Sequence, residues 1–252
     1  MNPELSIIVP GIRPTRWLKL YESILESTSK TFELIICGPY HPPKEMEGLR
    51  NFKYVKDFGT PVRASMIAAD LATGKYITWG ADDAVYLPGA LDKIINACEE
   101  MDSIVVCKYL EGVDGTHKTV QPNNYFTLNG SWWTTSRNFR PDWFLFNTGA
   151  MKTSTFKELG GWDCIFQGTF YSHADMAARA YLSGLEVTFD EMLLLDCDHF
   201  GNEVGDHSPI ELAQTVDDYS EFKQRYNDVS ISTNQLKTWK ETDPVWGGRF
   251  DE

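Results

Sequence analysis

Short apolar runs alternate with amphipathic stretches through the first 107 residues of the chain. The apolar runs end at turn-forming or polar residues and are shorter than a typical helix, so each one predicts a buried strand. Between them, apolar residues recur at helical spacing, which predicts amphipathic helices. This alternation predicts an α/β fold with a mostly parallel, Rossmann-like central sheet and helices on both of its faces. The strands are expected at 5–9, 32–37, 52–55, 76–79 and 103–107, and the helices at 16–26, 61–72 and 87–101.

The pattern changes from residue 108 to residue 147, where aromatic residues are frequent and periodic segments are few. A long irregular stretch in a compact domain is usually functional, so these aromatic rings could stack on sugar rings or bases. The alternative, which we favour for most of them, is a satellite core beneath a long loop.

Regular structure is expected again after this stretch. The pattern predicts helices at 153–159, 174–183 and 209–225, and strands at 186–189 and 192–195. The small residues of 201–206, with His207, would permit a mobile lid. From residue 228 onward we expect a tail that lies over the domain or is partly disordered.

Composition narrows the possible partners. The net charge of -13 argues against nucleic acid and anionic lipid as partners, because Lys and Arg supply most of the affinity for both. The five cysteines form no CxxC pair, which is typical of buried thiols in a reducing compartment. The N-terminus does not resemble a signal peptide, and no apolar run is long enough to span a membrane. These features predict a cytoplasmic protein with no transmembrane segment.

Two adjacent carboxylates, Asp82 and Asp83, follow the predicted strand at 76–79. Ligands gather at the carboxyl ends of strands in open α/β sheets, and carboxylates there can hold a divalent metal that in turn binds a pyrophosphate. The alternative is that the pair only forms a turn or caps a helix.

Several segments resemble the family 2 glycosyltransferases of the GT-A fold, in the same order along the chain. The similarity runs from residue 5 to about residue 200. The segments that carry it are Ser6-Ile-Ile-Val-Pro10, Glu33-Leu-Ile-Ile-Cys37, Ala72-Thr-Gly-Lys-Tyr-Ile-Thr-Trp-Gly-Ala-Asp-Asp83, Asn147-Thr-Gly-Ala-Met151 with Phe156-Lys-Glu-Leu-Gly-Gly-Trp-Asp163, and Ser172-His-Ala-Asp-Met-Ala-Ala-Arg179.

The resemblance implies an α/β GT-A domain at 1–208 and a C-terminal helix and tail at 209–252 packed on it. Within the domain, 1–108 would bind the nucleotide and 109–208 the acceptor. The implied activity is metal-assisted, inverting transfer of a sugar from a nucleotide-diphosphate sugar to a hydroxyl group of a glycan or another acceptor. The implied cofactor is Mn²⁺ or Mg²⁺.

The resemblance also implies site residues. Those expected to bind the nucleotide sugar are Pro10, Gly11, Arg13, Arg63 and Asp82. Those expected to bind the metal are Asp82, Asp83 and His199. Those expected near the acceptor are Gly149, Trp162 and Asp163.

Two residues compete for the role of catalytic base. His173 stands where the family carries an Asp, and imidazole titrates near neutrality. Asp175 keeps the carboxylate chemistry of the family and is slightly preferred. Its alternative role is to interact with the helix dipole or with Arg179 one turn later.

The sequence departs from the family at positions that carry chemistry. Gly38 and Pro39 stand where an Asp pair is usual, and Gly80 stands where the first Asp of the DxD motif is usual. The usual Arg-Asn pair is absent, and Arg63 is the nearest arginine. These losses support an alternative function, namely a catalytically reduced GT-A domain that binds a nucleotide or glycan. A nucleotidyltransferase is a weaker alternative, because the loop at 11–16 has a single glycine.

Overall fold

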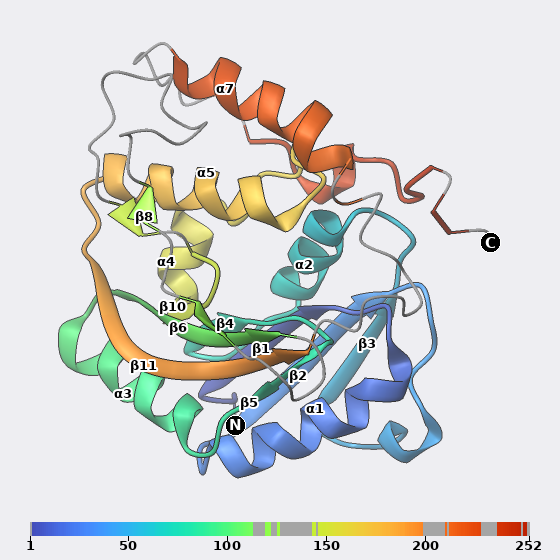
Figure 1. The fold of residues 1–252 in the computed structure, drawn as a ribbon. Coiled ribbons are helices and arrows are strands. Elements are labelled where there is room, and N and C mark those ends of the chain that lie inside the picture. The colour runs from blue at the N-terminus through green and yellow to red at the C-terminus, as the bar shows by residue number, and fades with distance from the viewer. Residues whose placement is uncertain are drawn as a thin grey trace.

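The structure is a computed structural model, and it describes residues 2–112, 119–121, 125–126, 143–144, 146–198, 210, 212–227, 236–247 and 249–250. A curled sheet forms its centre, with the strand order β3-β2-β1-β4-β10-β6-β11-β5 and with β7 paired to β6 (Figure 1). Helices cover both faces of the sheet, so the predicted α/β architecture is confirmed.

The first half of the sheet is parallel, as the alternating pattern predicts. The β1 strand pairs in parallel with both β2 and β4, and β2 pairs in parallel with β3. Along β1, Ile7 and Val9 pack into one core whereas Ile8 packs into the core on the opposite face. The strands are β1 (Leu5–Pro10), β2 (Phe32–Gly38), β3 (Phe52–Lys56) and β4 (Tyr76–Trp79).

The second half of the sheet is mixed. The short strand β10 lies antiparallel between β4 and β6, and β11 is parallel to β6 but antiparallel to β5. The sequence predicts two strands at 186–195, but the structure has one strand with two register shifts that bend it around the sheet. The strands are β5 (Ala84–Tyr86), β6 (Ile104–Gly112), β7 (Thr119–Gln121), β10 (Gly149–Lys152) and β11 (Val187–Asp198), and β8 (Tyr125–Phe126) pairs separately with β9 (Trp143–Phe144).

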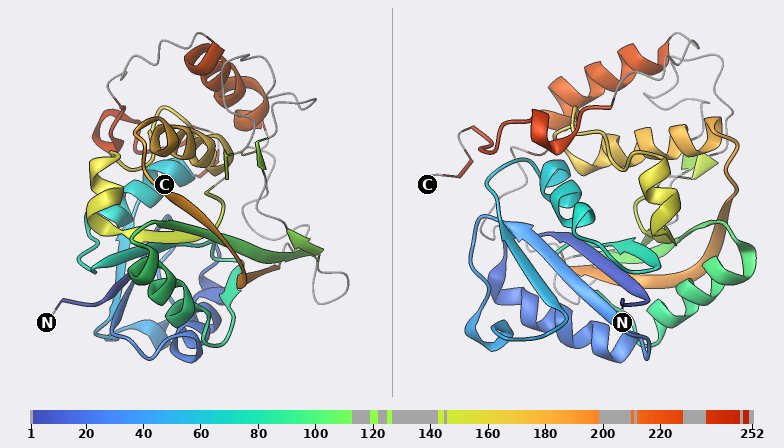
Figure 2. Two further views of the ribbon diagram at one scale, coloured as in Figure 1. Left: turned by 90° about the vertical axis from the view of Figure 1, so that its left-hand side faces the viewer. Right: turned by 180° about the vertical axis from the view of Figure 1, so that it is seen from behind.

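Two helical layers enclose the sheet (Figure 2). Helices α1 and α3 contribute to one core and α2, α4 and α5 to the other. A third apolar cluster joins α5 to α7 near the C-terminus. The helices are α1 (Pro14–Ser27), α2 (Pro61–Asp70), α3 (Ala90–Met101), α4 (Thr153–Glu158), α5 (Thr169–Leu182) and α7 (Tyr219–Asn227), with the shorter η1 (Lys44–Met46), the π-helix η2 (Ala213–Asp218) and η3 (Trp239–Glu241).

One boundary difference bears on the site. The sequence predicts that the helix at 174–183 begins beside Asp175, but α5 begins at Thr169. Asp175 therefore lies within the helix rather than at its N-terminus, and an interaction with the N-terminal dipole does not explain it. Its other predicted role, an i,i+4 pair with Arg179, is present at 2.8 Å.

Several predictions stay predictions. His199, His207 and the loop at 201–206 lie outside the described residues, as do most of the aromatic side chains of 108–147.

All five cysteines are buried and free of disulfide bonds. Among the described helices, none has both the length and the apolar character needed to cross a bilayer. The cytoplasmic location and the division at residue 208 are not tested.

Candidate functional site

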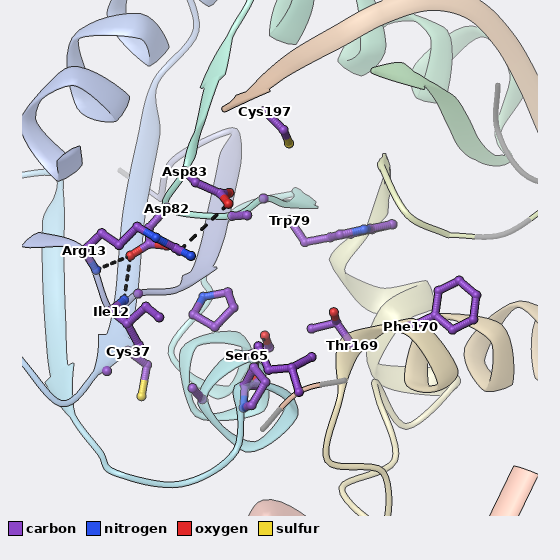
Figure 3. Close-up of a pocket in the computed structure, with 18 of the residues that line it drawn as sticks. Ile12, Arg13, Cys37, Ser65, Trp79, Asp82, Asp83, Thr169, Phe170 and Cys197 are labelled. Carbon is purple, nitrogen blue, oxygen red and sulfur yellow. Dashed lines mark hydrogen bonds and ion pairs between the residues drawn. The ribbon is translucent and has the colours of Figure 1, made fainter. Parts of the chain in front are cut away.

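A cavity of about 490 Å³ opens at the carboxyl ends of the parallel strands. Its wall includes Pro10 and Gly11 at the end of β1, Gly38 at the end of β2, and residues 79–83 at the end of β4. The N-terminal turns of α2 and α5 also face it, and Figure 3 shows Thr169 and Phe170 reaching the space from α5. The cavity therefore lies where open α/β sheets place their ligands.

Asp82 is the anchor of the loop after β1. Its Oδ2 accepts hydrogen bonds from the backbone N–H of Ile12 at 2.6 Å, from that of Arg13, and from Trp17 Nε1 at 3.2 Å. Its Oδ1 accepts one from Arg13 Nη1 at 2.7 Å. Burial raises the pKa of Asp82, whereas the Arg13 guanidinium and these N–H donors oppose that rise. The carboxylate thus joins β4 to the start of α1, and its lone pairs are largely occupied.

Asp83, the second carboxylate of the pair, also lies at the cavity. It lines the wall, and Arg13 Nη1 lies 3.9 Å from its Oδ2 (Figure 3). Its backbone oxygen accepts a hydrogen bond from Asp198 N at 2.8 Å, which fixes Asp83 against the end of β11. Mg²⁺ commonly takes only one or two protein carboxylates beside phosphate and water, and Asp83 suits that arrangement. Within the described ranges, no cluster of three or more His, Cys, Asp or Glu could hold a metal ion without such help.

Tyr86 stands beside the position of the missing first Asp. A Cβ atom built on Gly80 would lie 2.9 Å from Tyr86 Oη, closer than ordinary contact. Tyr86 is 3% exposed, and burial raises its pKa, so the phenol stays protonated. The space that a carboxylate at position 80 would need is therefore occupied from β5.

Arg63, a predicted nucleotide-binding residue, is engaged elsewhere. Its Nε and Nη2 bind both oxygens of Asp57 at 2.9–3.1 Å, and its Nη1 donates to the backbone oxygens of Trp239 and Thr242. Arg63 is buried and is absent from the cavity wall, which Asp57 reaches instead. The arginine therefore links α2 to the C-terminal segment.

His173 and Trp162 lie together on the cavity wall. The imidazole is half-buried, with its ring centroid 5.4 Å from that of Trp162 and 6.4 Å from that of Trp79. Burial lowers the pKa of His173 to about 3, so the ring is neutral near pH 7. Trp162 is 2% exposed, and its Nε1–H has no hydrogen-bond partner among the residues that the structure describes. A neutral imidazole and an unpaired indole donor thus stand at the same wall.

Asp175 lies behind this wall in a buried ionic network. Its Oδ2 accepts from Arg179 Nε at 2.8 Å, and its Oδ1 accepts from Arg225 Nη1 at 2.7 Å and from Tyr226 Oη at 2.6 Å. Asp175 is fully buried and does not line the cavity. Arg225 also pairs with Asp163 at 2.8 Å, so one α7 arginine bridges two acidic residues of the acceptor half. These contacts favour positioning roles for Asp175 and Asp163.

Gly149 is needed by the sheet itself. A Cβ there would lie 2.4 Å from the Val105 carbonyl oxygen, because β10 and β6 approach closely at this point. Its neighbours Asn147 and Thr148 line the cavity, whereas Gly149 does not. At this point of the chain, Asn147 and Thr148 therefore reach the cavity in place of Gly149.

The cavity residues that sequence reasoning missed include Arg249 and Phe250, which come from the chain's far end. Their location follows from tertiary packing. The only available signal was the cluster of Trp246 and a Gly pair in the tail.

Comparison with known proteins supports the fold. The family profile described as Glycosyl transferase family 2 matches residues 18–158, more than half of the chain. A search of curated proteins finds no match.

Solved structures of one glycosyltransferase resemble the chain. S. aureus TarS has a TM-score of 0.56 and 16% identity over 80% of this chain and 37% of that one. TarS 1–349 in complex with UDP-GlcNAc has a TM-score of 0.57 and 17% identity, over 81% of this chain and 60% of that one. The complex of TarS 1–349 with UDP has a TM-score of 0.57 and 14% identity, over 92% of this chain and 68% of that one. This chain thus spans less than two thirds of the first and second of these structures.

The profile match spans β2 to α4 and includes the carboxylate pair Asp82 and Asp83. The solved structures share the fold over 80% to 92% of this chain. The chain therefore belongs to glycosyl transferase family 2 and has the GT-A fold.

Proposed function

We propose that this chain transfers a sugar from a nucleotide-diphosphate sugar to an acceptor hydroxyl group, with inversion. The observation that carries the proposal is that one cavity is shared by both halves of the domain. Gly11 and Asp83 reach it from the nucleotide half, and Trp162 and His173 reach it from the acceptor half. A donor bound between them would place its sugar beside the acceptor residues. The UDP and UDP-GlcNAc complexes of the TarS neighbour make a uridine nucleotide the first donor to test.

The diphosphate would lie near Arg13 and Asp83. Arg13 supplies a fixed positive charge at this end of the cavity, and Asp83 would hold Mg²⁺ or Mn²⁺ together with phosphate oxygens. The metal, when bound, would stabilise the negative charge that develops on the departing diphosphate. Asp82, the metal ligand preferred from the sequence, would act by holding Arg13 and the β1 loop in place.

His173 would serve as the proton acceptor. In the transfer, the acceptor oxygen forms a bond to the anomeric carbon, the bond from that carbon to the diphosphate breaks, and the hydroxyl proton passes to the imidazole. An anionic donor in the cavity would raise the low pKa of His173, because a nearby negative charge favours the protonated ring. Asp175 would hold the helix that presents His173.

A second function, nucleotide or glycan binding without transfer, is favoured by three observations. Asp82 is saturated by N–H donors, Tyr86 occupies the space beside Gly80, and Arg63 is bound to Asp57. Each of these removes a group that the family usually directs at the donor.

The proposal is tested by thermal unfolding with UDP, GDP, CDP and dTDP, each with and without Mn²⁺ or Mg²⁺. We expect one nucleotide to raise the unfolding temperature only when the metal is present, and Asp83→Asn to abolish that rise. Glu22→Gln, an exposed change on α1, is the matched control and should leave the rise intact. The absence of any shift with the wild-type protein would overturn both the transferase function and the nucleotide-binding function. Release of nucleotide diphosphate from the matching sugar donor would separate the transferase from the binding module.

A further inference from the structure

The C-terminal strap, residues 236–250 with residue 248 outside the described set, crosses from the acceptor half to the nucleotide half. At its start, Cys164 N donates to Lys237 O and Lys237 N donates to Asp163 Oδ1, both at 2.9 Å. It then passes over α2, where Trp239 Nε1 donates to Asp70 Oδ2 at 2.6 Å (Figure 1). The strap is therefore built into the domain by hydrogen bonds along its length.

The strap next follows the loop between β3 and α2. Val245 forms a parallel bridge with Phe58, and Trp246 N donates to Phe58 O at 2.8 Å. The indole Nε1 of Trp246 also donates to Gln167 Oε1 at 2.8 Å, beside the start of α5. These bonds place the end of the strap beside the cavity.

Two consecutive strap residues, Arg249 and Phe250, form part of the cavity wall. The Phe250 ring is 8% exposed and meets Tyr40, which follows β2, edge-on at 6.2 Å. The Arg249 guanidinium lies 4.9 Å from the Trp246 ring and 5.0 Å from the Phe250 ring. The strap thus presents an aromatic ring and a stacked guanidinium at the wall formed by the ends of β2 and β3.

That wall offers few side chains of its own. Gly38 cannot carry one, since a Cβ there would lie 1.7 Å from Gly11 O. Gly59 and Pro39 bring no hydrogen-bonding side chain, and Asp57 is held by Arg63. A nucleobase at this wall would meet planar or cationic groups mainly from the strap.

We propose that the C-terminal strap completes the nucleoside subsite, with Phe250 and Arg249 contacting the base of a nucleotide diphosphate. The inference rests on the proposed function and adds the residues that discriminate the base. Aromatic rings and guanidinium planes stack on bases, and the guanidinium can also donate to base oxygens. With the strap forming part of its wall, the cavity has a volume of about 490 Å³, which is enough for a nucleotide.

The test compares wild type, Phe250→Leu, Arg249→Ala and the control Lys240→Ala by calorimetric titration. Lys240 is an exposed strap cation that is absent from the cavity wall. Each protein is titrated, in the presence of Mn²⁺, with the nucleotide diphosphate that stabilises wild type and with inorganic pyrophosphate. We expect Phe250→Leu and Arg249→Ala to bind the nucleotide about tenfold or more weakly than wild type, because stacking on the base contributes substantially to the binding free energy. Both variants should bind pyrophosphate as wild type does. Lys240→Ala should match wild type with both.

Unchanged nucleotide affinity in both strap variants would overturn the strap proposal and leave the proposed function standing. Tighter nucleotide binding would also overturn it, since the strap would then compete with the ligand. Equal weakening for nucleotide and pyrophosphate would show a general loss of structure and likewise contradict it. If wild type binds no nucleotide diphosphate, the proposed function fails together with the strap proposal. Phe250→Tyr keeps the ring and should retain the wild-type affinity.

Discussion

Arg13 Nη1 lies 2.7 Å from Asp82 Oδ1, and the Asp82 side chain is 2% exposed. The same guanidinium nitrogen is 3.9 Å from Asp83 Oδ2, so one arginine serves two consecutive carboxylates. A buried carboxylate needs such a partner, because an uncompensated charge in the interior is costly. The pair thus fixes the loop after β1, which forms part of the cavity wall.

Arg13→Ala should destabilise the fold, because it leaves Asp82 buried without its cationic partner. We expect a loss of about 3 kcal/mol in the free energy of unfolding, measured by urea denaturation. Asp82→Asn in the same chain should restore part of that loss, since the amide carries no charge. If the double variant is no more stable than Arg13→Ala alone, the ion pair does not explain the effect.

Gly80→Asp, which restores the residue usual in the family, should destabilise the protein rather than improve the metal site. The new Cβ would lie 2.9 Å from Tyr86 Oη, and the forced displacement should cost about 1–3 kcal/mol. Adding Tyr86→Phe removes that oxygen and leaves 3.6 Å to the nearest ring carbon, so stability should largely return. Thermal unfolding of the two single variants and the double variant measures this coupling. Additive effects would contradict it.

Asp175→Ala should lower the free energy of unfolding. It would leave Arg179 and Arg225 without the carboxylate that both contact, and a broken buried ion pair costs about 3–5 kcal/mol. Burial and the Asp175 charge also raise the pKa of Tyr226 well above its ordinary value, so this phenol stays a donor to the carboxylate. Denaturant unfolding checks the loss. A variant of wild-type stability that has lost only turnover would instead support Asp175 as the base.

His173 should make the protein less stable in mild acid. The pKa of His173 is about 3 in the folded protein, whereas the ordinary pKa of a histidine is 6.5. Between pH 3 and pH 6.5 the unfolded chain therefore binds one more proton than the folded protein does. Stability from the neutral ring is complete above about pH 6.5 and is lost as the pH falls toward 3, by about 2 kcal/mol at pH 5. His173→Phe should reduce the loss between pH 7 and pH 5, as measured by denaturant titrations at both pH values. An equal pH dependence in the variant would contradict the low pKa.

The strand and helix pattern of residues 5–107 was largely predictable from local signals. The β1, β2 and β4 strands are apolar runs closed by turn residues, and parallel strands buried on both faces need such runs. The short strands β5 and β10 were not predicted. Both contain few β-branched residues, and both pair with strands from distant parts of the chain. The β5 strand pairs with β11, and β10 pairs with β4 and β6.

The sequence by itself determined the α/β class, the order of its elements and the placing of Asp82 and Asp83 at the end of a buried strand. It determined these because hydrophobic periodicity and turn residues act over short distances. Only the tertiary structure decided what each site residue contacts. Asp82 is bound by Arg13 and Asp175 by Arg225, and both pairings depend on packing between distant parts of the chain. Arg63 pairs with Asp57 nearby in the sequence, but Trp239 and Thr242, which its Nη1 also binds, come from the far end of the chain. The same packing brings Phe250 beside Tyr40, about two hundred residues away along the chain, and no local pattern encodes that meeting.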